Sequence, residues 1–379
     1  MGFINEWKNL EKIKKLTDKG CSIVFYAENK ASMNHFRLLL LELTEIRNLP
    51  VCYVTSIKDD SVFSLKNKNI FAFHIGDGVV RTKFFLTLKA KILIMDMPDL
   101  ETFHIKRSKV YPVHYIYIFH SMFSTHSYLR KGAIDNYDTI FCVGEHHEKE
   151  IRETEKIYQL KPKKLIKYGF GRLDTLLNEK EKFQQMNIKT ENLIIIAPSY
   201  GDDNLLNICG MELIEILLKM NFKVLLRPHF LILKNSNELI KKIQLKFRNN
   251  PNFILEKGII SPIQFHNSMC MISDWSGISL EYAFTFERPV IFIDVPKKIL
   301  NQSSEHISLK PIEISIREKI GFVVSPNNLE IIPQIIENIF NNSPLKQQIK
   351  KIRSETVYNI GKSAIIGADI IEKIYKDLK

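Results

Sequence analysis

The chain has 379 residues, of which 45% are hydrophobic and 25% are charged. This length suits two medium-sized domains, and the composition excludes disordered, collagen-like and coiled-coil proteins. With 54 Lys and Arg against 42 Asp and Glu, the net charge is +12. A positive field favours polyanionic partners such as nucleotides, phosphorylated polymers, nucleic acid or an anionic membrane surface.

The first residues have the pattern of an amphipathic helix. Apolar residues recur there at helical intervals among lysines: Phe3, Trp7, Leu10, Ile13 and Leu16. Two readings are open, a surface helix that packs on its own domain, or a helix in peripheral contact with an anionic membrane. The segment 81–91 mixes four cations with apolar side chains and leaves the same two readings open.

Short apolar runs rich in Val, Ile, Phe and Tyr recur through the first half of the chain. We expect strands at 22–26, 51–55, 70–75, 91–95, 115–119, 139–143 and 165–168. Because these runs are continuous rather than alternating, they suit a parallel sheet covered on both faces. Helical patterns at 33–46 and 145–160 lie between them, which predicts a doubly wound α/β domain over residues 1–185.

A polar stretch at 178–191 is expected to link this domain to a second α/β series. Its expected strands are 193–197, 223–226, 252–255, 270–273, 289–293 and 322–324, with a helix at 211–220. We therefore predict a second domain over 186–345 and a helical tail over 346–379. Two tandem Rossmann-like domains facing across a cleft form the GT-B fold of glycosyltransferases and some epimerases, and open α/β sheets bind ligands at the carboxyl ends of their strands.

The five cysteines are far apart and match no zinc motif: Cys21, Cys52, Cys142, Cys209 and Cys270. We predict buried thiols in a reducing compartment rather than disulfides. No signal-peptide pattern opens the chain, and no apolar stretch approaches the ~18 residues that span a bilayer. We therefore expect a cytoplasmic protein, with the peripheral contact at the inner face of the cell membrane left open.

The most informative motif follows the expected strand 270–273. Ser276, Gly277 and Ser279 stand where an apolar-periodic helix begins, and the backbone N–H groups of a helix N-terminus are a ready anion site. Glu281, a turn further on, is placed to accept hydrogen bonds from ribose hydroxyls. The alternative is an ordinary helix cap with Ser276 as the N-cap.

Two other expected strands end in ionisable side chains. Arg227 and His229 follow the strand 223–226, where a guanidinium and an imidazole could neutralise a diphosphate, although a solvated loop remains the alternative. His120 follows the strand 115–119 and suits a general base. The alternatives there are a structural histidine, or His126 as the base.

Smaller signals come from two loops and a histidine pair. The loops 168–174, with Arg172, and 197–203, with Ser199, have the small residues and charges of ligand-binding loops. His146 and His147 lie among glutamates but lack the H-E-x-x-H spacing of a zinc protease, so we read them as the solvated start of a helix.

Taken in order, these motifs resemble the CDP-glycerol glycerophosphotransferase family of teichoic acid primases and polymerases. The ordered set is His120, Gly-x-Gly-Arg-Leu-Asp at 169–174, Ala-Pro-Ser-Tyr-Gly-Asp-Asp at 197–203, Arg-Pro-His at 227–229 and Ser-Asp-Trp-Ser-Gly at 273–277. The chain departs from the family's usual residues at Ser121, Gly171, Gly201 and Gly277. The resemblance therefore implies the fold and the activated-phosphate chemistry, but it does not identify the donor or the acceptor.

The resemblance implies a GT-B fold with the nucleotide held by the second domain and the acceptor by the first. His120 would deprotonate an acceptor hydroxyl, which attacks the β-phosphate of a CDP-alditol and expels CMP. His229, Arg227 and the amides of Ser276 and Gly277 would stabilise the phosphate charge. The implied donor-binding set is Arg172, Ser199, Arg227, Ser273, Asp274, Ser276, Gly277, Ser279 and Glu281. We expect no cofactor besides this substrate and no required metal.

The implied acceptor is a cell-surface polymer or a lipid-linked molecule, as in teichoic acid or capsule synthesis. The nearest alternative is a GT-B glycosyltransferase or epimerase that uses a nucleotide sugar in capsule or lipopolysaccharide synthesis and releases a nucleoside diphosphate. A nucleic-acid binder is disfavoured because the cations are dispersed and no nucleic-acid motif is present.

Overall fold

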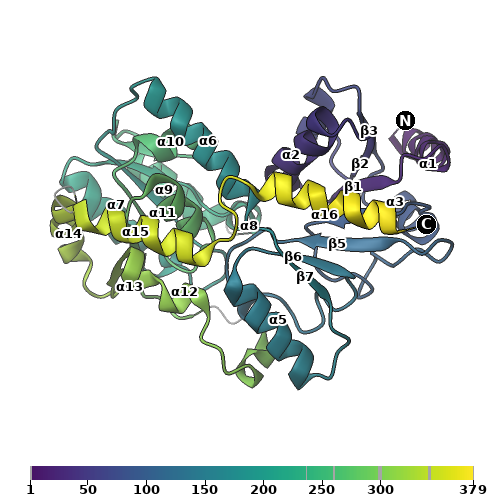
Figure 1. The fold of residues 1–379 in the computed structure, drawn as a ribbon. Coiled ribbons are helices and arrows are strands. Elements are labelled where there is room, and N and C mark those ends of the chain that lie inside the picture. The colour runs from purple at the N-terminus through teal and green to yellow at the C-terminus, as the bar shows by residue number, and fades with distance from the viewer. Residues whose placement is uncertain (1, 236, 259–260, 298–300, 340–342, 379) are drawn as a thin grey trace. The chain divides into compact units, whose positions relative to one another are not determined.

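The structure is a computed structural model in which residues 2–235, 237–258, 261–297, 301–339 and 343–378 are described. Thirteen strands are present among these residues. Figure 1 shows the fold and labels several of the strands and helices. The strands are β1 Ile23–Ala27, β2 Val51–Thr55, β3 Ile70–His74, β4 Ile92–Met95, β5 His114–Ile118, β6 Thr139–Cys142, β7 Lys164–Lys167, β8 Leu193–Ala197, β9 Lys223–Leu226, β10 Phe253–Leu255, β11 Cys270–Ser273, β12 Val290–Ile293 and β13 Gly321–Val324.

The strands form two sheets in which every described pair is parallel. The first sheet has the order β3-β2-β1-β4-β5-β6-β7, and the second has the order β10-β9-β8-β11-β12-β13. In each sheet, successive strands are first added on one side and then on the other. This reversal of strand order falls between β1 and β4 in the first sheet and between β8 and β11 in the second. Ligands of doubly wound folds bind beside such reversals, so both sheets offer a candidate location.

Helices connect the strands. The longer ones are α1 Gly2–Asp18, α2 Ser32–Leu41, α3 Val79–Thr87, α5 Glu145–Ile157, α6 Gly171–Gln185, α7 Leu205–Lys219, α9 Asn237–Phe247, α11 Ile278–Phe286, α14 Ile332–Ile339, α15 Ser343–Thr356 and α16 Ser363–Asp377. The short ones are η1 Glu42–Ile46, η2 Ser61–Ser64, α4 Thr125–Tyr128, α8 Phe230–Asn235, α10 Pro262–Asn267, η3 Gln302–His306, α12 Ile312–Ser315, α13 Arg317–Ile320 and η4 Leu329–Ile331.

Each sheet belongs to a compact unit with its own core. Unit 1 comprises Met1–Thr175, Asn301–Leu309 and Thr356–Lys379, and unit 2 comprises Leu176–Leu300 and Lys310–Glu355. In unit 1, α2 and α16 pack apolar side chains on one face of the sheet, among them Phe36 and Ile371, both 0% exposed. In unit 2, α7, α9 and α14 cover one face of the second sheet.

The α/β fold class predicted from the sequence is confirmed, since all thirteen expected strands are present within one or two residues. The boundaries of the compact units differ from the expected division at 185/186 and 346. The polar stretch after residue 178 is largely the second half of α6. The expected tail is divided, because α16 packs on α2 in unit 1 while most of α15 belongs to unit 2. The expected boundaries were drawn from the polarity of short segments, and this polarity does not show which distant helix a segment packs against.

The cysteines and the pair His146 and His147 are buried or partly buried in the structure. All five cysteines are free and buried, as predicted. The reading of His146 and His147 as a solvated helix start is wrong, because their Nε2 atoms lie 2.9 Å from the carbonyl oxygens of Met122 and Phe123. Both rings therefore join α5 to the loop before α4, and burial lowers the pKa of each.

Candidate functional site

Three loops of unit 2 meet at the carboxyl edge of its sheet. They follow β9, β8 and β11, which are neighbours in the sheet and include the point where the strand order reverses. The loop after β8 carries Ser199, the loop after β9 carries Arg227 and His229, and the loop after β11 leads into α11. The structure thus brings the second-domain motifs together at one edge.

Asp274 organises these loops. It is 1% exposed, and its carboxylate accepts hydrogen bonds from the backbone N–H of Ser199 at 2.7 Å and of Leu205 at 2.9 Å. Burial raises its pKa, and the two N–H donors oppose that rise. Both carboxylate oxygens are therefore engaged in joining the loop after β11 to the loop after β8 and to the start of α7.

The serines of the same motif also make internal contacts. Ser273 donates to the carbonyl of Ala197 at 2.7 Å, and Ser279 donates to the carbonyl of Ser276 at 2.8 Å. Gly277, rather than Ser276, is the N-cap of α11, and no side chain caps this helix end. Of the first-turn N–H groups of α11, that of Ser279 already donates to Ser276 O at 3.1 Å, and Glu281 lies half-buried in that turn.

The loop after β9 places an imidazole against an aromatic ring. The rings of His229 and Tyr200 have centroids 4.9 Å apart, and Nδ1 of His229 accepts from the Leu231 N–H at 3.3 Å. Because Nδ1 accepts in that bond, Nε2 carries the hydrogen of the neutral ring. Arg227 continues the sheet, because its N–H donates to Ile196 O at 2.9 Å.

In unit 1, His120 follows β5 at the carboxyl edge of the first sheet. Its Nδ1 lies 3.1 Å from the carbonyl oxygen of Asp96 and 3.4 Å from the hydroxyl of Tyr117. A carbonyl oxygen only accepts, so Nδ1 carries the hydrogen and Nε2 is the basic nitrogen. Burial lowers the pKa of His120, which keeps the ring neutral and able to take a proton.

Two residues beside His120 were missed by the sequence analysis. Asp96 directly follows β4, is 4% exposed and accepts a hydrogen bond from Ser32 Oγ at 2.9 Å. Burial raises its pKa to about 7. His35, in the first turn of α2, has its ring centroid 6.4 Å from that of His120. The strand-end rule that selected His120 also selects Asp96, whereas no local signal marks His35.

Arg172 is the second residue of α6 and belongs to unit 1, whereas the loops after β8, β9 and β11 belong to unit 2. Its neighbour Asp174 is structural: its carboxylate accepts from Gly361 N at 2.7 Å and from Ser363 N at 3.1 Å. A Cβ at Gly169, where φ is +103°, would collide with the carbonyl oxygen of Tyr358. This motif therefore fixes the chain that leads into α16.

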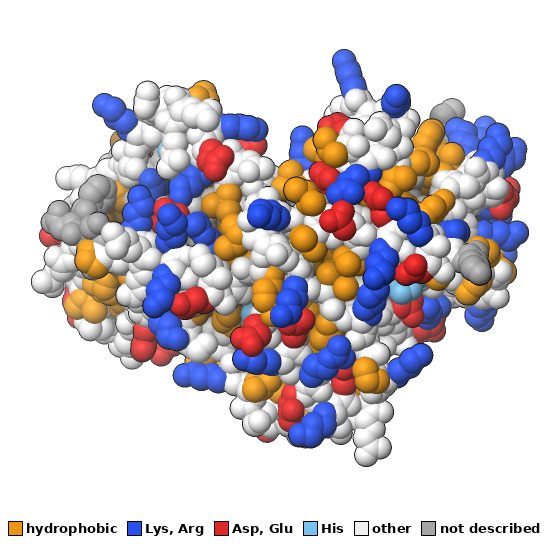
Figure 2. Space-filling model, in the orientation of Figure 1, with side chains coloured by type: hydrophobic (Ala, Val, Ile, Leu, Met, Phe, Trp, Pro, Cys, Tyr) orange, Lys and Arg blue, Asp and Glu red, His pale blue; other side chains and the backbone are white. Residues whose placement is uncertain are grey.

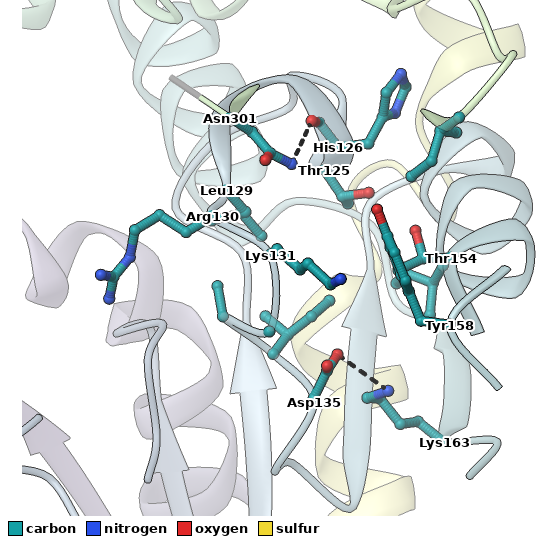
Figure 3. A pocket seen from close by; sticks show the side chains of 15 residues that line it. Thr125, His126, Leu129, Arg130, Lys131, Asp135, Thr154, Tyr158, Lys163 and Asn301 are labelled. Atoms are coloured by element: carbon teal, nitrogen blue, oxygen red, sulfur yellow. Dashed lines mark hydrogen bonds and ion pairs between the residues drawn. The ribbon is translucent and has the colours of Figure 1, made fainter. Parts of the chain in front are cut away.

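A pocket of unit 1 lies between the segment after α4, the end of α5 and residues 301–307 (Figure 3). Its polar side chains are largely paired with each other or with nearby groups. Asn301 donates to His126 O at 2.9 Å, Lys163 lies 3.6 Å from both Asp135 and Glu155, and Lys131 stands 3.9 Å over the ring of Tyr158. His126 is buried and its Nε2 lies 2.9 Å from Leu309 O, which identifies a structural histidine.

Among the residues that the structure describes, no group of three or more His, Cys, Asp and Glu side chains is placed to hold a metal ion. Within the same residues, no helix is both long and apolar enough to cross a membrane.

The fold is that of several sugar-nucleotide enzymes. The UDP-GlcNAc 2-epimerase of Methanocaldococcus jannaschii, in complex with UDP-GlcNAc and UDP, superposes with a TM-score of 0.57 at 13% identity, covering 93% of this chain and 99% of that one. A putative UDP-N-acetylglucosamine 2-epimerase from Listeria monocytogenes gives 0.59 at 10% identity, covering 94% and 98%. The UDP-GlcNAc 2-epimerase of Neisseria meningitidis gives 0.55 at 16% identity, covering 93% and 99%. The chain therefore has two Rossmann-like domains of the GT-B type.

The family is identified by sequence. Residues 13–298, well over half of the chain, match the family model for CDP-Glycerol:Poly(glycerophosphate) glycerophosphotransferase. The chain belongs to this family of transferases, which confirms the resemblance drawn from its motifs. No curated protein matches the chain in a direct search.

Proposed function

We propose that the protein transfers an alditol phosphate, such as glycerol phosphate, from a CDP-activated donor to a hydroxyl of a cell-surface polymer or lipid-linked acceptor. The acceptor oxygen forms a bond to the β-phosphorus, and the bond from that phosphorus to the bridging oxygen breaks. CMP leaves with the bonding electron pair. The acceptor proton passes to Nε2 of His120, which the Asp96 carbonyl holds in the tautomer suited to this role.

The observation that carries the proposal is the convergence of three donor-type loops in unit 2. Arg227 and His229 follow β9, Ser199 follows β8, and the first turn of α11 follows β11; these are three neighbouring strands of the second sheet. An imidazole, a guanidinium and uncapped N–H groups together suit a diphosphate, whose charge grows on the leaving phosphate during transfer. Ser199 and Asp274 serve this site by fixing the loops, since Asp274 binds the Ser199 N–H.

The direct test is calorimetric binding of CDP, CMP, UDP and GDP to the wild-type protein and to His229→Ala. We expect binding of the cytidine nucleotides alone, weakened about tenfold or more by the substitution, because a hydrogen bond to a charged group contributes about 1.5–3 kcal/mol. Release of CMP from CDP-glycerol or CDP-ribitol in the presence of acceptor would then identify the donor. Retention of full CDP affinity by His229→Ala would contradict the assignment of His229.

A second candidate is a glycosyltransferase or epimerase acting on a nucleotide sugar. It is favoured by structural neighbours that were solved with UDP or UDP-GlcNAc bound. Attack at a sugar carbon would release a nucleoside diphosphate instead of CMP. Selective binding of UDP in the calorimetric series would favour this candidate.

We further propose that α1 brings the protein to an anionic membrane surface, where a lipid-linked acceptor would lie. Leu10 and Ile13 of α1 are each 1% exposed, and this helix contacts β3 and α3. Its other end presents Phe3 and Ile4, which are 58% and 62% exposed. Exposed apolar side chains beside lysines, here Lys8 on the same helix, are typical of interfacial helices.

A further inference from the structure

A group of basic side chains lies near the N-terminus of α6 in unit 1. The ring of His35 has its centroid 6.4 Å from the ring of His120 and 5.8 Å from that of Phe170, the residue that directly precedes α6. Arg172 lies in the first turn of α6. Burial first, and then the charges of His120 and Arg172, hold the pKa of His35 well below its ordinary value.

The start of α6 adds backbone donors to this group. Its first helical hydrogen bond is donated by Asp174 N to Phe170 O at 3.2 Å. The N–H groups of residues 171–173 precede it and have no acceptor within the helix. A Cβ on Gly171 would stand 3.2 Å from the carbonyl oxygen of His35, so this helix end packs directly on α2. The 15-residue helix directs its positive end toward this position.

Two acidic residues nearby bind groups in other segments of unit 1. Asp174, the acidic residue in the first turn of α6, binds Gly361 and Ser363. The carboxyl of Asp96 accepts from Ser32. Both carboxyl groups are thus turned to partners in other segments of unit 1.

His35 itself supplies a second, independent indication of a ligand. It is only 7% exposed, and its Nδ1 has no hydrogen-bond partner among the described residues. A buried polar atom without a partner costs about 1–3 kcal/mol, and such atoms are rare in native structures. An anionic oxygen beside the α6 N-terminus would accept from this nitrogen and from the first-turn N–H groups together.

We propose that Arg172, His35 and the first turn of α6 form a phosphate site in unit 1 that holds a phosphate group of the acceptor. This inference rests on the proposed function for the identity of the acceptor. The site assigns Arg172 to the acceptor rather than to the donor nucleotide. Because the ring of His120 lies beside that of His35, a phosphate held here places a nearby hydroxyl of the same molecule within reach of the base. His35 and Arg172 then select phosphorylated polyols over neutral ones.

The test is a titration of the wild-type protein with sn-glycerol 3-phosphate, followed through the imidazole Cε1–H signals in NMR spectra. The chain has 11 histidines, so the spectrum is sparse, and His35→Gln and His120→Gln assign two of the signals. We expect saturable shifts of the His35 and His120 signals with glycerol 3-phosphate at millimolar concentration and none with glycerol. Inorganic phosphate should bind more weakly than the ester, because it lacks the polyol.

Arg172→Gln should weaken glycerol 3-phosphate binding about tenfold or more and leave CDP binding unchanged. The matched control is Arg37→Gln, which removes an exposed arginine two residues from His35 on α2. An unchanged signal from the buried His147 confirms that each variant is folded.

Three results would overturn the site: no shift at either histidine, equal affinity for inorganic phosphate and the ester, or an Arg172→Gln variant that loses CDP instead of glycerol 3-phosphate. Failure of the proposed function looks different. In that case glycerol 3-phosphate still binds unit 1, but no cytidine nucleotide binds and no CMP is released.

Discussion

Buried carboxyl groups at strand ends dominate the chemistry of this protein at the scale of single residues. Asp96 and Asp274 each directly follow a strand at the reversal point of their sheet, and both have a pKa raised by burial. Asp274 receives two backbone N–H donors, while the hydroxyl of Ser32 binds Asp96. These surroundings make Asp274 a fixed structural acceptor and give Asp96 a proton that it can lose near neutral pH.

The raised pKa of Asp96 predicts a pH-dependent stability. Folding moves this pKa from 3.8 to about 7, so the folded state binds the proton more tightly than the unfolded chain. The stabilising effect is fully present below pH ~4 and is lost as pH rises through about 7, a difference of about 4 kcal/mol. Asp96→Asn keeps an acceptor for Ser32 but cannot ionise. The stability of this variant relative to the wild type should therefore increase between these pH values.

The measurement is urea unfolding of both proteins from pH 4 to 8, with the exposed Asp18→Asn as the matched control. Only the difference between wild type and variant is used, which removes the contribution of other titrating groups. A difference that stays constant over this range would show that Asp96 ionises normally in the folded protein.

Several motif residues serve the framework of their loops. Asp274 and Ser273 in unit 2 and Asp174 in unit 1 bind backbone or hydroxyl groups of other segments. The sequence places these residues at strand ends or helix starts, and that placement is correct. It cannot tell a carboxylate that faces a ligand from one that faces a backbone N–H, because the partners lie 69 to 189 residues away.

At the scale of elements, α1 is the helix with the clearest prediction. Its apolar residues divide between Leu10 and Ile13, which are buried, and Phe3 and Ile4, which are exposed. We expect the double variant Phe3→Ser, Ile4→Ser to lose affinity for phosphatidylglycerol vesicles about tenfold or more, because each buried apolar side chain contributes about 1.5–3 kcal/mol at the membrane. Cosedimentation with vesicles measures this loss.

The matched control for α1 is Ile46→Ser, Phe63→Ser, since these side chains are 66% and 45% exposed elsewhere in unit 1. It should bind vesicles like the wild type, and vesicles of phosphatidylcholine should bind neither protein well. Equal binding by the α1 variant and the wild type would exclude docking through this helix.

The strands were the most predictable elements. A buried parallel strand needs a continuous apolar run of four or five residues, and such runs are visible without knowledge of their neighbours. Helix ends were less predictable. Within the expected helix at 33–46, the α-helix α2 ends at Leu41, and the π-helix η1 follows directly and ends at Ile46. The expected helix at 211–220 begins earlier, because Asn204 caps Leu206 N and Asn207 N.

Charge is distributed without strong segregation at the scale of the whole molecule. Lys and Arg side chains are interspersed with Asp and Glu on the face in Figure 2, in spite of the net charge of +12. The excess of Lys and Arg over Asp and Glu therefore does not form a single basic surface on that face. Local groups, such as those at the N-termini of α6 and α11, are the better guide to anion binding.

The interleaving of the two units also makes a prediction about the complete chain. Unit 1 is completed by residues Thr356–Lys379, and α16 contributes Ala368, Ile371 and Ile374 to its core. A chain that ends at Glu355 exposes the apolar side chains of α2 that α16 covers. We expect unit 1 to lose its cooperative unfolding transition, while unit 2 keeps its own.

Circular dichroism during urea unfolding and limited proteolysis with mass spectrometry would measure this outcome. A protected fragment from unit 2 and rapid cleavage of unit 1 are expected. The control is Ile365→Ser on the exposed side of α16, which is 45% exposed and should leave both transitions unchanged. A truncated chain with unit 1 still protected would contradict the role of α16.

The sequence by itself determined the fold class, the strand positions and the family, because apolar runs and short ordered motifs are local properties of the chain. Only the tertiary structure decided which motif residues hold loops together, and only it placed His35 and Asp96 beside His120. It also decided that the C-terminal helix completes the first unit. These properties depend on contacts between residues far apart in sequence, which local polarity and spacing do not record.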